Sequence, residues 1–133
     1  MDFIGQYFKS DLLKSGGDIP EGHYEDPAMK KTVVPFRNGI MLAIAAGFAE
    51  SVGAHSIAIG NHFGDHAIYP DCRSAFIDPM REAIEAGTYA EIGLDSPFVD
   101  LNKADIAFMG NSMGVPWELT YSCYNGREEH CGK

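Results

Sequence analysis

The sequence predicts an α/β fold built on a parallel sheet, of which these 133 residues form only a part. An apolar helix pattern over residues 40–52 precedes a strand pattern at residues 56–59, and a second helix and strand follow at residues 76–87 and 90–98. Helices that alternate with strands are typical of parallel sheets. Such sheets need several strands and cover on both faces, so two strands among three main helices indicate an incomplete domain.

Length and charge narrow the possible functions. We expect residues 1–133 to be a single partial domain. The formal net charge of -9 argues against binding to nucleic acid or an anionic membrane, because both need a basic surface. No apolar run approaches the length of a membrane span, and no signal-peptide pattern is present, so we predict a cytoplasmic protein.

The amino-terminal region predicts a short helix and a linker. Apolar residues spaced four apart predict a helix over residues 2–14. The Ser15-Gly16-Gly17-Asp18 segment resembles a phosphate-binding loop in composition, but no buried strand precedes it and Pro20 follows. We therefore predict a helix C-cap there and an irregular, exposed linker through Lys31.

The next segment predicts a buried helix and a buried strand. Asn38 is a favourable N-cap, and the helix after it is apolar on every face, as buried helices are. Gly53 should end the helix in the left-handed conformation, and the strand Ser56–Ile59 follows. One stripe of this helix consists of Ile40, Ile44, Phe48 and Val52.

The remaining elements are a helix, a strand and a last helix. The helix over residues 76–87 contains Pro79, which should bend it or restrict its first turn. The strand pattern Ala90–Phe98 is weakened by a glycine and a proline. Asn102 or its neighbour is the expected N-cap of the last helix, Gly114 should end it, and the tail from Val115 onward is predicted to be irregular. The inward-facing residues of that helix would be Ile106, Met109 and Met113.

The polar loop from Gly60 to Arg73 is the predicted site. It follows the strand directly, and ligands of α/β sheets bind beyond the carboxyl ends of the strands. The loop supplies an amide, two imidazoles, carboxylates, a phenol, a thiol and a guanidinium group. A solvated surface loop is the alternative, and composition alone does not separate the two.

Two chemical roles in this loop stay open. His62 and His66 are more simply explained as hydrogen-bonding groups than as metal ligands, because a spacing of four has no fixed geometry outside a helix. Cys72 lies between Asp71 and Arg73, whose charges act on a thiol pKa in opposite directions. A nucleophilic Cys72 is an alternative for which no partner histidine can be assigned.

Cationic and thiol residues outside the loop are also candidates. Arg37 precedes the buried helix and Lys103 lies in the first turn of the last one, and the amino ends of helices attract anions. Both side chains could equally be solvated. Cys123 and Cys131 are spaced too widely for the tight cysteine pair of a structural zinc site, so core or surface thiols are the alternative.

Taken in order, these blocks resemble the QueC family, 7-cyano-7-deazaguanine synthase. The resemblance runs from about Ile4 to Lys133. The blocks that carry it are Val34-Pro35-x-Arg37-Asn38, Gly60 through Gly64-Asp65 to Tyr69-Pro70-Asp71-Cys72-Arg73, Asn102-Lys103, Glu118-Leu119-Thr120-x-Ser122-Cys123-Tyr124-Asn125-Gly126, and Cys131-Gly132.

The resemblance implies a fold and a reaction. The fold would be Rossmann-like, of the adenine nucleotide hydrolase-like PP-loop ATPase group. That group has a three-layer sheet with helices on both faces, here lacking its amino-terminal strands. Such enzymes use ATP with Mg²⁺ to activate the carboxylate of 7-carboxy-7-deazaguanine, which ammonia converts to an amide and then to a nitrile. The product feeds queuosine and related deazapurine modifications.

The resemblance also assigns residues. Cys123 and Cys131 match the first two of four cysteines that hold a structural Zn²⁺, so residues 115–133 would begin a truncated zinc-binding segment. Tyr69 would stack on the deazapurine, and Asp71 would accept hydrogen bonds from its guanine-like edge. By role, the residues are Asp65 and Lys103 for catalysis; Tyr69, Asp71, Cys72 and Arg73 for substrate; and Arg37, Asn38 and Gly60 for nucleotide.

Departures from the family pattern qualify the expected activity. Family members begin with a strand and an S-G-G-x-D-S loop that grips ATP pyrophosphate, whereas Ile19 and Pro20 occupy the places of the aspartate and serine here. The third and fourth zinc cysteines are missing as well. We therefore expect a fragment or one piece of a split gene, inactive without an amino-terminal half in cis or trans. We also expect a homo-oligomer (dimer), weak zinc binding and a poorly ordered tail after Ser122.

Two other functions remain as alternatives. A non-catalytic remnant would keep the deazapurine-binding loop without turnover. Another PP-loop ligase or sulfur-transfer enzyme would use Cys72 as a working thiol.

Overall fold

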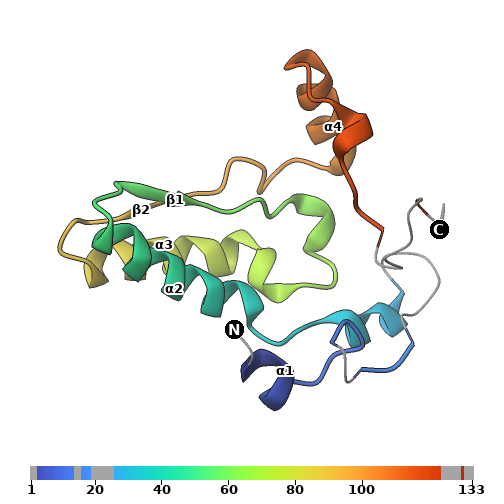
Figure 1. The fold of residues 1–133 in the computed structure, drawn as a ribbon, viewed down its shortest axis with the longest axis horizontal. Coiled ribbons are helices and arrows are strands. Elements are labelled where there is room, and N and C mark those ends of the chain that lie inside the picture. The colour runs from blue at the N-terminus through green and yellow to red at the C-terminus, as the bar shows by residue number, and fades with distance from the viewer. Residues whose placement is uncertain (1–2, 14–15, 19–25, 124–129, 131–133) are drawn as a thin grey trace.

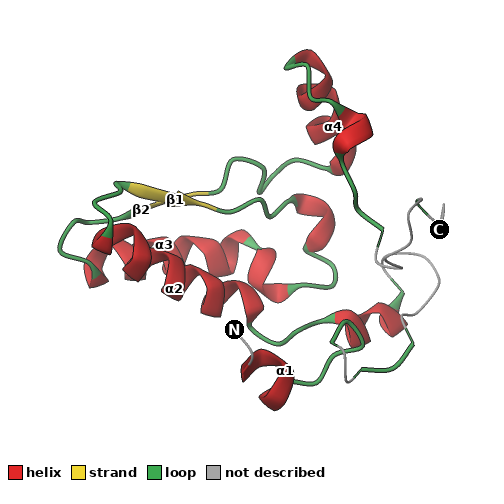
Figure 2. Ribbon diagram, viewed as in Figure 1, coloured by secondary structure: helices red, strands yellow, loops and turns green. Residues whose placement is uncertain are grey.

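The fold centres on a pair of parallel strands with two helices against one face (Figures 1 and 2). The strands are β1 (Ser56–Ala58) and β2 (Gly93–Asp95), and Ile57 lies opposite Leu94. Both α2 (Arg37–Ser51) and α3 (Ser74–Gly87) lie on the same side of the strand pair (Figure 1). The computed structural model describes residues 3–13, 16–18, 26–123 and 130.

The core fills the space between the two helices and the strand pair. Ile77 of α3 and Ile92, just before β2, are the largest fully buried side chains among the described residues. Side chains alternate between the two faces of a strand, so Ile57 packs against the core. Ser56 and Ala58 point to the opposite face, where both are exposed. The prediction of a buried strand is thus wrong for that face. The buried apolar cluster consists of Leu42, Ala46, Ala49, Ile77, Ile84, Ile92 and Leu94.

Helix α2 is buried on one side only, which corrects the prediction of an all-round buried helix. Its core side carries Leu42, Ala46 and Ala49. On the side turned away from the core, Ile44 is 50% exposed and Phe48 66% exposed. Among the described elements, β1 and α3 pack against the core side of α2 and η3 contacts its first turn, so this apolar surface stays exposed.

The amino-terminal segment differs most from prediction. Helix α1 (Phe3–Tyr7) is shorter than the predicted 2–14 because the chain turns away to meet a later segment. The backbone amide of Asp11 donates to the Lys31 carbonyl at 2.8 Å, and the Ser10 hydroxyl donates to the same oxygen. The predicted linker contains a 3-10 helix, η1 (Pro27–Thr32), and the described helix before the glycine pair, α1, already ends at Tyr7.

The second half agrees more closely with prediction. Helix α3 confirms the helix over residues 76–87 and contains Pro79 within its length. Strand β2 is shorter than the predicted Ala90–Phe98, because the chain turns directly after Asp95.

Helix α4 (Lys103–Ser112) begins after Asn102, which confirms the predicted N-cap, and a capping box is formed there. Asn102 accepts from the amides of Ala104 and Asp105, and the Asp105 carboxylate accepts from the Asn102 amide. Gly114 ends this region with φ of +73°, the left-handed conformation. The inward placement of Met109 and Met113 is wrong, because α4 projects away from the core (Figure 1) and both are exposed.

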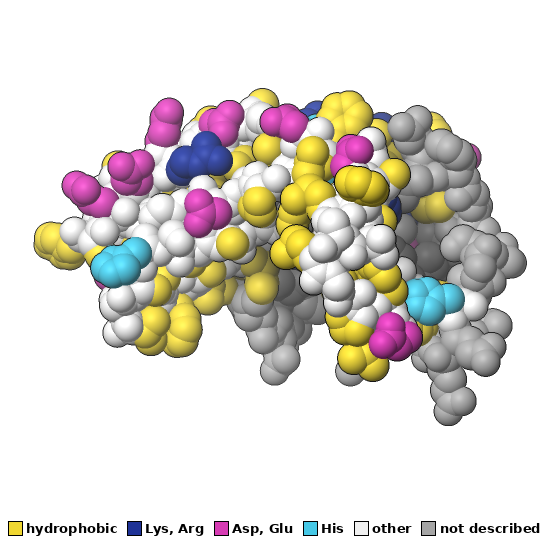
Figure 3. Space-filling model, turned by 90° about the horizontal axis from the view of Figure 1, so that it is seen from above, with side chains coloured by type: hydrophobic (Ala, Val, Ile, Leu, Met, Phe, Trp, Pro, Cys, Tyr) yellow, Lys and Arg dark blue, Asp and Glu magenta, His cyan; other side chains and the backbone are white. Residues whose placement is uncertain are grey.

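Two further features bear on the predicted class. The stretch Pro27–Ser51 is long and apolar enough to span a membrane by length and composition alone. The prediction that no apolar run approaches the length of a membrane span is therefore wrong. The α2 portion of this stretch contributes the core residues named above, as a core helix does. Acidic side chains are spread over the face seen in Figure 3, with few basic ones among them. The α/β class is confirmed, and the three-layer sheet with helices on both faces stays a prediction.

The buried isoleucine before β2 gives a test of this core. We expect Ile92→Ala to lower the free energy of unfolding by about 2–5 kcal/mol, because the cavity left behind cannot fully collapse. Ile44→Ala, at a half-exposed position on α2, should change it by less than about 1 kcal/mol. Urea denaturation followed by circular dichroism measures both; equal losses would contradict the placement of the core.

Candidate functional site

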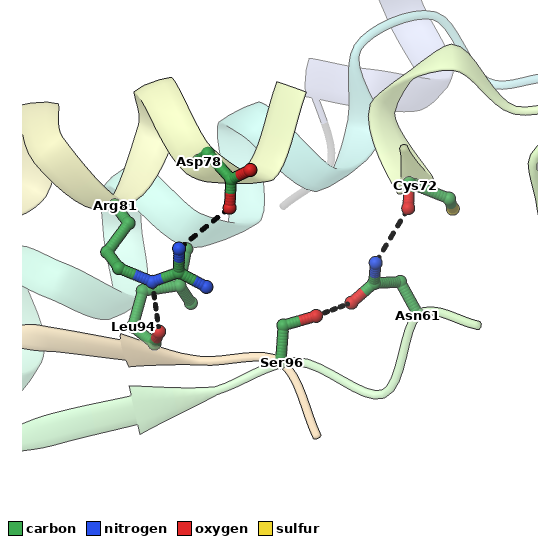
Figure 4. A network of polar contacts seen from close by, with 6 residues as sticks. All are labelled: Asn61, Cys72, Asp78, Arg81, Leu94 and Ser96. Atoms are coloured by element: carbon green, nitrogen blue, oxygen red, sulfur yellow. Dashed lines mark hydrogen bonds and ion pairs between the residues drawn. The ribbon is translucent and has the colours of Figure 1, made fainter. Parts of the chain in front are cut away.

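The loop after β1 is held at the carboxyl ends of both strands by one buried amide. Asn61 is 4% exposed. Its Nδ2 donates to the Cys72 carbonyl at 2.7 Å, and its Oδ1 accepts from the Ser96 hydroxyl at 2.7 Å (Figure 4). Asn61 follows β1, Ser96 follows β2, and Cys72 ends the 3-10 helix η3 (Pro70–Cys72). This single side chain therefore fixes η3 beyond the strand ends, where the sequence placed the site.

A second set of contacts joins η3 to the start of α2. The Asp71 carboxylate accepts from the backbone amide of Asn38 at 2.9 Å, and the Asn38 side-chain amide donates to the Asp71 carbonyl at 3.2 Å. The same amide donates to Cys72 Sγ at 3.3 Å. Asn38 is therefore not the N-cap that we predicted. Phe36, with φ of 55° in the left-handed region, occupies that place, and the carboxylate of Asp71 satisfies an amide of the first turn.

A pocket of about 550 Å³ lies where α2 and α3 begin. The rings of Phe36 and Phe76 meet edge to face on its wall, with centroids 5.6 Å apart. Asp71 and Arg73 are the charged side chains among its lining residues. Only one oxygen of the Asp71 carboxylate is used by Asn38. The lining consists of Val33, Pro35, Phe36, Pro70, Asp71, Arg73, Ala75 and Phe76.

Two other predicted substrate residues stabilise the loop instead of lining this pocket. The hydroxyls of Tyr69 and Thr32 form a hydrogen bond of 3.0 Å, which ties the loop to η1. Cys72 is 4% exposed. Burial and, to a smaller extent, the carboxylates of Asp65 and Asp71 together raise the pKa of the Cys72 thiol from 9.0 to about 11. A protonated, buried thiol is a poor nucleophile at neutral pH.

Arg73 is positioned by the loop and remains accessible. Its Nε donates to the His66 carbonyl at 2.7 Å, while the residue as a whole is exposed. One hydrogen bond thus orients the guanidinium group at the pocket wall and leaves its other donors for a ligand.

The predicted catalytic and nucleotide residues do not line this pocket. Asp65 ends the 3-10 helix η2 (Phe63–Asp65), where its carboxylate lies 3.4 Å from His62 Nε2. Lys103 is the first residue of α4, near η2, because the Phe63 amide donates to the carbonyl of Leu101. Arg37 and Gly60 are exposed. These assignments stay predictions.

The predicted zinc ligand Cys123 and the glycine pair do not line this pocket. Cys123 is half-buried, and Cys131 lies outside the described residues. In the described part of the chain, no group of three or more His, Cys, Asp or Glu residues is arranged to hold a metal ion. The Gly16 amide donates to the Leu13 carbonyl and the Gly17 amide donates to the Asp11 carboxylate. Most of the tail after Ser122, predicted to be poorly ordered, is not described.

Sequence reasoning missed the apolar walls of the pocket. Phe36 lies beside the predicted Arg37, and Phe76 lies three residues after Arg73, but both read as ordinary helix residues. The available signal was the Pro35-Phe36 pair directly ahead of an apolar helix. Asn61 was noted only as one polar group of the loop, because its long-range partners have no signature in local sequence.

Comparison with known proteins places these residues in a family. The model of the family described as queuosine biosynthesis protein QueC matches residues 1–133. A 7-cyano-7-deazaguanine synthase of Porphyromonas gingivalis is 61% identical over 132 residues, which cover 99% of this chain and 60% of that protein. Synthases of the same name from Desulfotalea psychrophila and Caldicellulosiruptor saccharolyticus are 49% and 44% identical, over 99% and 100% of this chain.

The coverage of these relatives is partial. The chain spans about 60% of the length of each of the first two named relatives and 59% of the third. The match extends over the whole chain. It therefore includes the loop, the hydrogen-bonded residues Asp71 and Asn38, and the pocket. The chain therefore belongs to the QueC family.

Proposed function

We propose that this chain is the carboxy-terminal part of an ATP-dependent carbon-nitrogen ligase. The ligase converts 7-carboxy-7-deazaguanine and ammonia to 7-cyano-7-deazaguanine in queuosine or related deazapurine biosynthesis. The relatives that bear the name of this synthase, at up to 61% identity, support the proposal. The observation that carries it is the pocket at the start of α2 and α3, which combines an aromatic wall with one carboxylate and one guanidinium group.

The pocket suits a planar, purine-like acid. Its volume of about 550 Å³ is within the usual range for small-molecule sites, and Phe36 and Phe76 offer aromatic surface to a flat ring. The Asp71 oxygen that does not contact Asn38 can accept from N–H groups of the guanine-like edge. The Arg73 guanidinium can bind the substrate carboxylate, for which its planar donors are well suited.

The reaction requires an activated carboxylate. A carboxylate resists attack by ammonia because it carries negative charge and its oxygen is a poor leaving group. ATP with Mg²⁺ would supply the activation. Arg37 and Lys103 would neutralise phosphate oxygens, and Asp65 would be the acidic catalytic residue beside Lys103. The described residues provide no phosphate-gripping loop, so we assign that part to an amino-terminal half supplied in cis or trans.

The remaining assignments complete the proposal. Structural Zn²⁺ would use Cys123 and Cys131 with two further cysteines from outside this chain. The protein would act in the cytoplasm, as a homo-oligomer (dimer). A non-catalytic deazapurine-binding remnant is the second candidate, because the pocket residues all lie within this chain whereas the phosphate-gripping loop is assigned to the amino-terminal half.

Nitrile formation tests the function directly. The chain alone, with ATP, Mg²⁺, Zn²⁺, ammonia and 7-carboxy-7-deazaguanine, should give no nitrile product. Co-expression with a polypeptide that carries the S-G-G-x-D-S half should give product, detected by mass spectrometry. Absence of product in the co-expressed, zinc-saturated pair would favour the remnant.

Cys72→Ser in that co-expressed pair separates the ligase from a sulfur-transfer enzyme. A buried thiol with a pKa of about 11 has a structural role, so the variant should keep turnover at a reduced level. Complete loss of turnover with an unchanged circular dichroism spectrum would instead identify Cys72 as a working thiol.

Substrate binding to the isolated chain tests the role of Arg73. We expect Arg73→Ala to raise the Kd for 7-carboxy-7-deazaguanine at least about tenfold in isothermal titration calorimetry, because a charge-assisted hydrogen bond is lost. Lys30→Ala removes the same charge from an exposed position that does not line the pocket, and should leave Kd unchanged. Equal Kd values for the wild type and Arg73→Ala would show that Arg73 does not bind the substrate carboxylate.

A further inference from the structure

The aromatic residue that the sequence assigned to stacking is not one of those that line the pocket. The hydroxyl of Tyr69 is bonded to that of Thr32 at 3.0 Å, and Tyr69 is absent from the pocket lining. The aromatic residues of the lining are Phe36 and Phe76. Phe76 also packs against the buried core cluster, whereas Phe36 is 58% exposed. Of the two, Phe36 therefore has more ring surface to offer a ligand.

Phe36 has a backbone conformation that residues with a side chain rarely adopt. Its φ of 55° and ψ of 26° lie in the left-handed region, where the Cβ atom is crowded by the backbone. Burial of the ring offsets little of this strain, because more than half of the residue is exposed. Strained residues of this kind cluster at ligand sites, where the strain holds a group in its working position. The placement of Phe36 beside a pocket agrees with that pattern.

Gly39 makes room for the Phe36 ring. It is buried in the first turn of α2, and a Cβ atom there would overlap the Cδ1, Cε1 and Cζ atoms of Phe36. Glycine weakens a helix relative to alanine, so a glycine at this place needs a packing reason. The close approach of the ring is that reason. Phe76 meets the same ring at an interplanar angle of 85°, so two neighbours set its position at the pocket wall.

We propose that Phe36 is the residue that stacks on the flat ring of the substrate, and that Gly39 is the positioning residue that seats it there. The inference rests on the proposed function for the identity of the ligand. Recognition is then divided around the pocket: Phe36 contacts the face of the ligand ring, whereas Asp71 and Arg73 bind groups at its edge. Because stacking depends on the ring face, Phe36 should contribute equally to ligands with and without the carboxylate.

Two ligands separate contact with the face from contact with the edge. 7-Deazaguanine has the ring of 7-carboxy-7-deazaguanine but lacks the carboxylate. In isothermal titration calorimetry with the isolated chain, we expect Phe36→Leu to raise the Kd of both by the same factor, at least about fivefold, because an apolar side chain remains but the aromatic face is lost. Arg73→Ala should raise the Kd of the carboxylated ligand only.

A stacking contact also has a spectroscopic signature. An aromatic ring that lies over a ligand shifts the carbon-bound ring proton of that ligand upfield in its NMR spectrum. We expect this shift for both ligands in the wild-type chain and a smaller one in Phe36→Leu at saturating ligand. A side chain that only stabilised the fold would not change the shift of the bound ligand.

Gly39→Ala tests the positioning role. The added methyl group should displace the ring, and so raise the Kd of both ligands and reduce the upfield shift, as Phe36→Leu does. The double variant should bind no more weakly than Phe36→Leu alone, because leucine lacks Cε1 and Cζ and both changes act through one ring. The matched control is Gly47→Ala in the same helix, where a Cβ atom meets nothing within 4 Å and Kd should stay unchanged.

The outcomes separate this inference from the proposed reaction. Stacking by Phe36 is overturned if the wild-type chain binds neither ligand, or if Phe36→Leu, folded by circular dichroism, binds both as the wild type does. The positioning role is overturned if Gly39→Ala binds normally, or if its effect adds fully to that of Phe36→Leu. Binding that depends on Phe36, without nitrile formation by the co-expressed pair, would refute the reaction and leave the stacking contact in place.

Discussion

The contact between Asp71 and the first turn of α2 is the constraint on which the site depends. Helix α2 begins with amides that no residue of its own turn can satisfy, and Asp71 brings a carboxylate to one of them from 33 positions away. The positive end of the helix favours that charge. In return, the Asn38 side chain donates to the Asp71 carbonyl and to Cys72, so the loop and the helix fix each other.

This mutual constraint explains why the pocket forms where it does. Asn61 holds η3 at the carboxyl ends of the two strands, and Asp71 then draws the start of α2 to η3. The left-handed Phe36 directly precedes the helix, where its ring meets Phe76 of α3. Two helix starts and one loop thus converge, and a flat aromatic wall lies next to a charged pair. The buried Cys72 contacts both partners, because its Sγ accepts from Asn38 and its carbonyl accepts from Asn61.

Sequence reasoning predicted the elements with strong local signals and failed where distant contacts decide. The capping box at Asn102 and the left-handed turn at Gly114 depend on neighbouring residues, so their patterns were sufficient. Helix α1 ended early because of hydrogen bonds to Lys31, which no local pattern reveals. Asn38 has the residue type of an N-cap, yet a carboxylate from another segment satisfies the first turn in its place.

The predicted site residues divide in the same way. The loop was singled out because polar residues after a strand mark a ligand site in this class of fold, and of its residues Asp71 and Arg73 line the pocket. Tyr69 and Cys72 have reactive groups, but their partners at Thr32 and Asn38 direct them into the supporting structure. The apolar side of α2 was read as buried because sequence shows hydrophobicity and not what covers it.

Amide hydrogen exchange at Asn38, followed by NMR, tests the central constraint most directly. In the wild-type chain this amide should be protected, because it donates to a buried carboxylate. In Asp71→Ala its exchange should accelerate at least about tenfold, while the amide of Ala46 in the middle of α2 keeps its rate. An Asn38 amide that exchanges at the same rate in both proteins would show that Asp71 does not hold the helix.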